Sequence, residues 1–114
     1  MILMDIKIGD KVLVVISSLI SQYARNIDLV GRYGGEEFIV ILPNINLEES
    51  YRIADSIRLS IQQYDFGLPN LNVTISAGLA QYESEDVKTF VNRADTLLYQ
   101  AKRNGRNRIE YMLV

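Results

Sequence analysis

The fold is decided by the stretch Arg32-Tyr33-Gly34-Gly35-Glu36-Glu37-Phe38 and by the apolar run Ile39-Val40-Ile41-Leu42 behind it. Two adjacent glycines permit positive φ, so a strand that arrives through Leu29-Val30 can turn tightly and leave through 38–42 as a β-hairpin. Glycines at the turn leave room for a ligand against the backbone, and Glu36 and Glu37 offer the hard oxygen ligands that Mg²⁺ prefers. The stretch therefore predicts either a nucleotide and metal site or a solvated hairpin with a charged tip.

The composition of the chain excludes several kinds of chemistry. The 114 residues are enough for one domain with its own core, and the net charge of −2 gives no footprint for duplex nucleic acid or for an anionic membrane surface. The sequence has no cysteine and no histidine, which excludes disulfides and both Ser-His and Cys-His catalysis. Catalysis would have to use carboxylates, Lys, Arg, backbone groups and a bound metal.

No signal for membrane insertion is present. No apolar run approaches the roughly 20 residues that span a bilayer, and the N-terminus lacks the charged start and long apolar centre of a signal peptide. The absence of cysteine fits a reducing compartment. We expect a soluble, cytoplasmic domain, in a parent protein that can itself be membrane-anchored.

Hydrophobic periodicity predicts strands that alternate with amphipathic helices. Residues 1–4 are expected to form a buried strand that delivers Asp5 at its end, and Lys11 to Tyr23 a helix with Asp10 as N-cap. The β-branched run 12–16 favours a strand by propensity. Helical spacing decides for the helix, with an apolar stripe of Val12, Val15, Ile16, Leu19, Ile20 and Tyr23.

The second half of the chain continues this alternation. We expect a helix over residues 46–63 that Asn46 and Glu49 cap, a loop over 64–70, a strand over 71–80, a helix over 86–104 and a last strand over 108–112. The small residues Ser76-Ala77-Gly78 leave room for a closely packed neighbour, and Gly105 suits the end of its helix. The predicted fold is one α/β sandwich over 1–114, with helices packed on a mixed sheet.

Three groups of residues could carry chemistry. If the first strand lies beside the hairpin, Asp5, Glu36 and Glu37 converge on one point, as in metal-assisted phosphoryl or nucleotidyl transfer; otherwise they are three unrelated surface acids. The basic cluster 102–108 either caps the third helix or binds a triphosphate. Arg25 and Asp28 form either a weak surface salt bridge or a ligand site.

Taken together, several motifs resemble one family. They are Arg32 to Phe38, preceded by Arg25-x-x-Asp28 and followed by Asn72 to Gly78 and by Ala94-Asp95-x-x-Leu98-Tyr99-x-Ala101-Lys102-x-x-Gly105-Arg106-Asn107. Their order and spacing resemble the GGDEF domain of diguanylate cyclases, in the GGEEF form, over essentially the whole chain. The resemblance implies a core similar to nucleotidyl cyclases and polymerase palm domains (ferredoxin-like). It also implies condensation of two GTP molecules into cyclic di-GMP with release of two pyrophosphates.

The resemblance also implies roles for individual residues. Asp5, the carbonyl of Ile6 and Glu36 would bind two metal ions, Mg²⁺ or Mn²⁺, with Glu37 completing the acidic pair. Gly34 and Gly35 would let the nucleotide lie against the turn, Asp10 would hydrogen-bond guanine, and Lys102 and Arg106 would hold the phosphates. Arg25 and Asp28 match the site at which the product inhibits. The residues implied to bind ligands or metal are Asp5, Ile6, Asp10, Arg25, Asp28, Gly34, Gly35, Glu36, Glu37, Lys102 and Arg106.

The same resemblance implies a homodimer as the working unit, because one domain holds one GTP. Linked sensor, receiver or phosphodiesterase domains are expected in the parent protein. One departure stands out: only Ile6 to Gly9 separate Asp5 from Asp10, so about twelve residues of the family pattern, including a guanine-reading Asn, are absent. We expect an omitted loop between Ile6 and Lys7; a true deletion would instead favour a non-catalytic regulatory module that binds GTP or cyclic di-GMP. A purely structural dimerisation domain is a third possibility.

Overall fold

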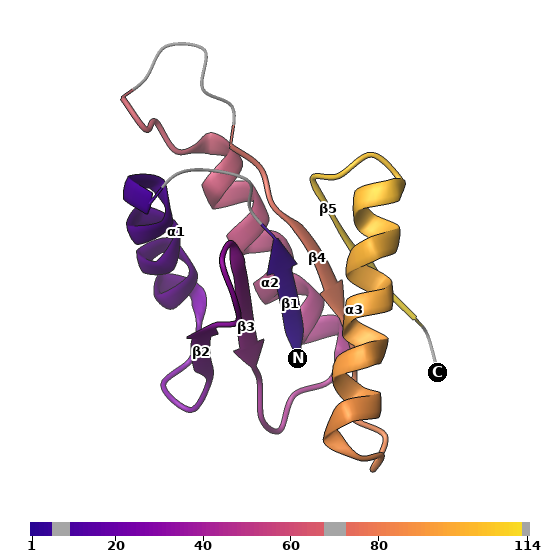
Figure 1. Cartoon of the computed structure of the whole chain (residues 1–114). Coiled ribbons are helices and arrows are strands. Elements are labelled where there is room, and N and C mark those ends of the chain that lie inside the picture. The colour runs from indigo at the N-terminus through magenta and orange to yellow at the C-terminus, as the bar shows by residue number, and fades with distance from the viewer. Residues whose placement is uncertain (6–9, 68–72, 113–114) are drawn as a thin grey trace.

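The computed structural model covers residues 1–114 and describes residues 1–5, 10–67 and 73–112, with the side chains of residues 10 and 11 also left undescribed (Figure 1). The described elements follow one another as β1 (Ile2–Asp5), α1 (Asp10–Tyr23), β2 (Leu29–Arg32), β3 (Glu37–Ile41), α2 (Leu47–Gln63), β4 (Ser76–Leu79), α3 (Val87–Arg103) and β5 (Arg108–Tyr111). In the described part of the chain, no helix is sufficiently long and apolar to cross a membrane.

The strands form one mixed sheet in the order β2-β3-β1-β4-β5. All neighbours are antiparallel except β4 and β5, which are parallel and are connected by α3. The first strand therefore lies at the centre of the sheet, between the hairpin and β4. The first strand is therefore a neighbour of the hairpin, which is the condition that the sequence left open for Asp5 and the hairpin acids to converge.

Helices cover both faces of the sheet (Figure 1). Successive side chains of a strand point to opposite faces, and β1 is buried on both. Ile2 and Met4 join the larger apolar cluster with α1 and α2, whereas Leu3 packs with Ala94 and Leu98 of α3. The predicted α/β sandwich is confirmed.

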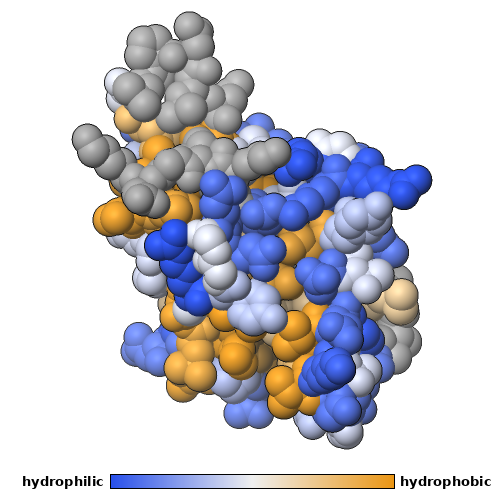
Figure 2. All heavy atoms as spheres, viewed as in Figure 1, coloured by the Kyte–Doolittle hydropathy of each residue, from blue (hydrophilic) through white to orange (hydrophobic). Residues whose placement is uncertain are grey.

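The helix α3 covers only part of its face of the sheet. Leu29 of β2 and Ile41 of β3 are paired across the hairpin and are 64% and 41% exposed. Figure 2, viewed from this side, shows hydrophobic surface over the lower part of the face, and hydrophilic surface nearer the edge where β1 ends.

The close approach of α3 to β4 depends on Gly78. A Cβ built on Gly78 would lie 2.2 Å from the carbonyl oxygen of Ala94 and 2.5 Å from the amide nitrogen of Leu98. Only a residue without a side chain fits there. The prediction that residues 76–78 admit a close neighbour is confirmed, and the neighbour is the backbone of α3.

The expected bounds of one strand need correction. The strand predicted over 71–80 is β4, which is only Ser76–Leu79; residues 73–75 are not strand, and 71 and 72 lie outside the described residues. The described ladders to both neighbours begin at Ser76, opposite Asp5 and Arg108. Val73 and Ile75 are nevertheless buried. The alternation of apolar and polar residues therefore extends over buried residues that precede the hydrogen-bonded part of the strand.

The apolar stripe of α1 also differs from the prediction. Leu13, Ile16 and Ile20 are its buried residues, whereas Tyr23 is 40% exposed. The helix begins at Asp10 itself, one residue earlier than expected. The seam against the core therefore runs through Leu13, which the predicted stripe omitted.

The caps of α2 and α3 agree with the sequence. The side chain of Asn46 accepts a hydrogen bond from the backbone N–H of Glu49 at 2.8 Å, and α2 ends at Gln63 as expected. Asp86 caps α3 in the same way, through the N–H of Thr89. After α3, Gly105 has φ of +118°, and the N–H of Arg106 donates to the carbonyl of Ala101 at 2.9 Å. This is the 6→1 bond of a Schellman motif.

Candidate functional site

The glycine-rich hairpin has the predicted form. Gly34 has φ of +125°, and a Cβ on Gly34 or on Gly35 would contact nothing within 4 Å. The guanidinium of Arg32 donates two hydrogen bonds to the carbonyl of Gly35, at 3.0 Å and 2.5 Å. The side chain of the last β2 residue thus holds the turn while the space beside both glycines stays open.

The pairing of β1 with β3 places Asp5 directly opposite Glu37. Side chains at opposed positions of an antiparallel pair lie on the same face. The ammonium of Lys102, in the last turn of α3, makes an ion pair with the Asp5 carboxylate, and the two side chains are 29% and 16% exposed. Asp5, Glu37 and Lys102 come from three elements and form one cluster at the end of β1, which we call the acidic edge.

The register extends the acidic edge across the sheet. Asp5 is paired with Ser76 of β4, and Ser76 is paired with Arg108 of β5. The four positions Glu37, Asp5, Ser76 and Arg108 therefore form one row on the α3 face. Two acids are followed along this row by the small, buried Ser76 and then by the basic Arg108.

The environment of Glu37 disfavours its charged form. Partial burial raises the pKa of the Glu37 carboxyl above its usual value, and the nearby charges of Asp5 and Asp95 raise this pKa further. The ammonium of Lys102 acts in the opposite direction. A cation beside Glu37 and Asp5 would relieve this repulsion.

The acidic edge is suited to a cation that also takes ligands from a substrate. Within the described ranges, no three His, Cys, Asp or Glu side chains are grouped closely enough to hold a metal ion. Mg²⁺ is usually bound by one or two carboxylates together with substrate phosphates. The pair Asp5 and Glu37 fits that requirement, and Glu36, which precedes Glu37 in the chain, is half-buried in the turn that leads into β3.

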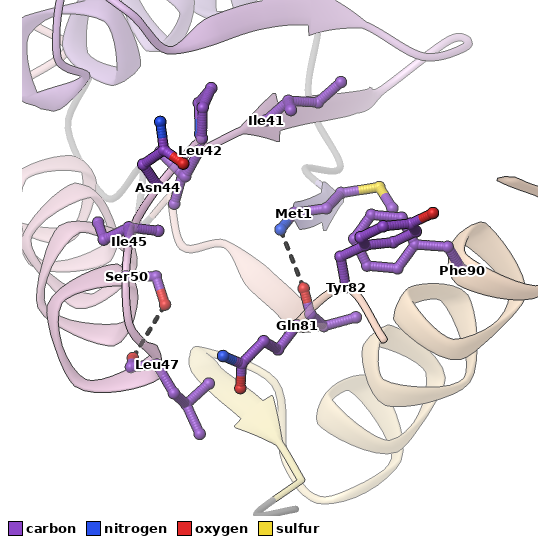
Figure 3. A pocket seen from close by; sticks show the side chains of 12 residues that line it. Met1, Ile41, Leu42, Asn44, Ile45, Leu47, Ser50, Gln81, Tyr82 and Phe90 are labelled. Atoms are coloured by element: carbon purple, nitrogen blue, oxygen red, sulfur yellow. Dashed lines mark hydrogen bonds between the residues drawn. The ribbon is translucent and has the colours of Figure 1, made fainter. Parts of the chain in front are cut away.

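A cavity of about 430 Å³ lies away from the acidic edge, at the opposite end of β1 (Figure 3). It is bordered by Met1 and Ile41 and by residues of the segment 42–50, and its lining is mostly apolar. Hydrogen bonds connect residues of its lining to each other: the amino group of Met1 donates to the carbonyl of Ala80, and Ser50 Oγ donates to the carbonyl of Leu47. None of the predicted site residues lines this cavity.

A second cavity, of about 400 Å³, lies beside the hairpin between α1 and strands β2 and β3. Its size is within the range of small-molecule sites. It is lined by Leu13, Val14, Ser17, Val30, Gly31, Arg32 and Phe38. The sequence analysis missed the α1 part of this lining, although Val14, an apolar residue outside the predicted apolar stripe of this helix, was a usable signal. In the structure its side chain is 72% exposed.

The residues of the basic cluster 102–108 have different surroundings in the structure. Lys102 belongs to the acidic edge, Arg106 is exposed in the turn after α3, and Arg108 Nε donates to the carbonyl of Arg106 at 3.3 Å. Lys102 and Arg103 both lie in the last turn of α3. Both side chains are therefore close enough to the end of the helix to interact with its last carbonyls, and Lys102 is in addition paired with the carboxylate of Asp5 in β1.

Arg25 and Asp28 form a much more buried pair than the surface salt bridge considered from sequence. The Asp28 side chain is fully buried, and Arg25 donates to it from Nε, from Nη2 at 2.8 Å and from its backbone N–H at 2.6 Å. Arg25 Nη2 also donates to the carbonyl of Pro43 at 2.6 Å. The side-chain hydrogen bonds to Asp28 raise the pKa of Arg25. The pair joins the α1–β2 connection to the end of the hairpin, and it does not touch the acidic edge.

Two predicted site groups lie outside the described residues. They are Ile6 and the side chain of Asp10, the first implied as a metal ligand and the second as a guanine contact. The connection between Ile6 and Lys7 lies in the same undescribed segment, so the expected omitted loop stays a prediction. A deletion relative to the family pattern stays a prediction.

The five-stranded mixed sheet, its three described helices and its glutamate hairpin define the class of the molecule, an α/β domain with an acidic site at one edge of the sheet. A family model described as "Diguanylate cyclase, GGDEF domain" matches residues 6–108, which is most of the chain. The chain therefore belongs to the GGDEF domain family.

Individual relatives agree with this assignment. The chain is 42% identical over 105 residues to diguanylate cyclase A of Treponema denticola, covering 89% of the chain and 28% of that relative. The structure of the active GGEEF domain of a diguanylate cyclase from Vibrio cholerae matches with a TM-score of 0.86 at 29% identity, covering 99% of this chain and 81% of that one.

A third match carries a ligand. The GGDEF domain of DgcB from Caulobacter crescentus, solved in complex with c-di-GMP, matches with a TM-score of 0.87 at 27% identity, covering 96% of this chain and 75% of that one. The chain spans less than a third of the length of the first curated relatives that it matches.

Proposed function

We propose that the chain is a diguanylate cyclase domain that condenses two GTP molecules into cyclic di-GMP and two pyrophosphates. The observation that carries the proposal is the acidic edge: Asp5 lies opposite Glu37, at the base of a glycine turn, with Lys102 on Asp5. Membership of the GGDEF family and about 40% identity to diguanylate cyclases support the same conclusion.

The residues divide into three roles. Asp5, Glu36 and the carbonyl of Ile6 would hold two Mg²⁺ or Mn²⁺ ions, with Glu37 as the second acid of the signature. Such ions, when bound, polarise the α-phosphate and lower the pKa of the attacking 3′-hydroxyl. Lys102 and Arg106 would bind phosphate oxygens, and Lys102, already beside Asp5, can exchange a carboxylate for a phosphate partner.

The nucleotide would lie along the hairpin. The open space beside Gly34 and Gly35 allows a ligand to approach the backbone, and the 400 Å³ cavity provides an apolar wall next to it. Asp10, at the start of α1, is proposed as the guanine contact. Each domain would bind one GTP, so two copies must face each other for each 3′-hydroxyl to reach the other's α-phosphate.

The test is formation of cyclic di-GMP from GTP with Mg²⁺ by the purified chain, followed by chromatography. We expect product from the parent chain and a loss of at least about 100-fold in Glu36→Ala and in Glu37→Ala, because the first removes a proposed metal ligand and the second a carboxylate of the acidic edge. Glu48→Ala, an exposed glutamate on α2, is the matched control and should retain activity. A dimerised chain that binds GTP but forms no product would refute the cyclase proposal.

One observation favours a second candidate. Only four residues connect β1 to α1, and the family pattern expected from the resemblance is longer there and includes a guanine-reading Asn. If that segment is deleted in the natural protein, we propose a regulatory module that binds GTP or cyclic di-GMP without turnover. Calorimetry with each nucleotide distinguishes the candidates: binding without product supports the module, and binding with product supports the cyclase.

Arg25 and Asp28 are proposed as the product site. The structure of a GGDEF domain with c-di-GMP makes this ligand a reasonable one to test. Because Arg25 already donates to Asp28 and to the carbonyl of Pro43, cyclic di-GMP would have to add to, or replace, an existing network. Loss of product inhibition in Arg25→Ala, with the initial rate retained, is the expected result.

A further inference from the structure

The turn between α3 and β5 has an unusual backbone. Gly105, Arg106 and Asn107 have φ values of +118°, +61° and +47° in succession. Asparagine tolerates this left-handed region better than most residues, whereas arginine adopts it rarely. The turn therefore needs contacts that fix it from outside.

One such contact comes from α2. Nη1 of Arg58 donates to the side-chain oxygen of Asn107 at 3.0 Å, across 49 positions of sequence. Arg58 is itself fixed on its own helix, since Nε donates to Asp55 at 2.7 Å and Nη1 also donates to Gln62 at 3.3 Å. Its side chain is only 17% exposed. Arg58 thus presents an N–H in a set position to the turn.

The position of Asn107 is next to two residues of interest. It follows Arg106, for which phosphate binding is proposed, and it precedes Arg108, which is paired with Ser76 in the row that contains Asp5. The direction of the Arg106 side chain depends on the dihedral angles of the turn. A bond that fixes Asn107 therefore restricts the direction in which the Arg106 side chain leaves the turn.

We propose that Arg58 is a positioning residue that holds the turn 105–107 in the conformation in which Arg106 meets the phosphates of the nucleotide. This inference rests on the proposed function, because it assumes that Arg106 binds phosphate. It assigns Arg58, which lies outside the hairpin, β1 and α3, a role in nucleotide affinity.

The experiment compares variants of the whole chain by calorimetric titration with GTP and Mg²⁺. We expect Arg58→Ala to weaken GTP binding about fivefold to tenfold, and Asn107→Ala to do the same. The double variant should lose no more than either single one, because both remove the same bond.

The matched control is Arg52→Ala. Arg52 is also an arginine of α2 paired with an acid of the same helix, Glu48 at 2.8 Å, but both side chains are more than 70% exposed. It should leave GTP affinity unchanged. Equal losses in Arg52→Ala and Arg58→Ala, or additive losses in the double variant, would overturn the proposal.

A second readout separates this inference from the proposed function. Backbone NMR shifts of residues 105–107, recorded without nucleotide, should change in Arg58→Ala and remain parent-like in Arg52→Ala. Unchanged shifts in Arg58→Ala overturn the positioning role whatever GTP does. The remaining case is that the shifts change in Arg58→Ala but Arg106→Ala binds GTP as the parent chain does. Arg58 would then position the turn, but the proposed phosphate-binding role of Arg106 would be refuted.

Discussion

At the scale of single residues, Glu37 combines a predicted functional role with an unfavourable position. Its carboxyl is partly buried, and both Asp5 and Asp95 disfavour its charge. The pKa of Glu37 is therefore raised, and the folded state holds this proton more tightly than the unfolded state does. The charge that the site requires at neutral pH thus costs the ligand-free domain some stability.

Glu37→Gln should accordingly stabilise the ligand-free domain. With a raised pKa, the folded domain loses stability relative to the unfolded chain as the pH rises from about the ordinary glutamate value, 4.5, through the raised value. At pH 7 we expect a gain in melting temperature of up to about 4 °C, and no gain below pH 4. Melting curves between pH 3.5 and 7.5 measure this, and a variant less stable than the parent at pH 7 would contradict it.

Lys102 has the opposite effect to Asp5 and Asp95 on the pKa of the Glu37 carboxyl. Because the Lys102 ammonium lowers the pKa of Glu37, Lys102→Met should raise this pKa further and also remove the partner of Asp5. NMR titration of the glutamate carboxyl carbons follows the change directly. Arg103→Met, in the same last turn of α3 but exposed, is the control and should leave the Glu37 titration where it is.

Which residues share the site was only partly predictable from the sequence. The hairpin and Asp5 were predicted because glycines, adjacent acids and a short apolar strand are local signals. The register that opposes Asp5 to Glu37, and the burial of Asp28 against the carbonyl of Pro43, depend on strand pairing and on contacts between segments distant in sequence. Periodicity carries no information about either, since it describes one element at a time.

At the scale of elements, the contact of α3 with β4 is the tightest constraint that the structure reveals. The backbone atoms that approach Gly78 belong to the middle of α3, the helix that also carries Lys102. The separation between α3 and the sheet therefore sets how far Lys102 stands from Asp5. A substitution of Gly78 should therefore alter the position of Lys102 relative to Asp5 as well as the packing of the core.

We expect Gly78→Ala to destabilise the domain by about 3 kcal/mol, because the new Cβ would overlap backbone atoms that cannot rotate away. Gly31→Ala is the matched control: it is also a strand glycine, and its Cβ would meet only the Cγ2 of Ile39 at 3.6 Å. That variant should stay within about 0.5 kcal/mol of the parent. Urea denaturation of both provides the measurement, and equal losses would show that the contact is not specific to Gly78.

The elements themselves differ in how well the sequence predicted them. The helices α2 and α3 were predicted to within one or two residues because caps and periodicity act within the segment. The β-branched run at the start of α1 was correctly given to a helix, but Leu13 was left out of its buried stripe. The length of β4 was wrong because its pairing partners, and not its own alternation, determine where a strand is hydrogen-bonded.

At the scale of the whole molecule, the proposed function makes the acidic edge of one domain half of a catalytic site, which a second copy of the domain completes. If each domain holds one GTP, the specific activity should rise with protein concentration and reach a plateau once dimers dominate. Rates of cyclic di-GMP formation over a 100-fold dilution series, with sedimentation at the same concentrations, measure this. A specific activity that stays constant where sedimentation finds only monomers would contradict the requirement for two copies.

The central place of β1 in the sheet has a consequence for the order of folding. The hairpin β2–β3 closes over a short loop, whereas β1 must pair with strands much later in the chain, which is slow because loop closure costs entropy. We expect Val40→Ala to retard refolding, and Leu3→Ala to act mainly on the rate of unfolding. The acidic edge would then be one of the last features to form, so a partly folded chain would contain a complete glycine hairpin and no place to bind a nucleotide.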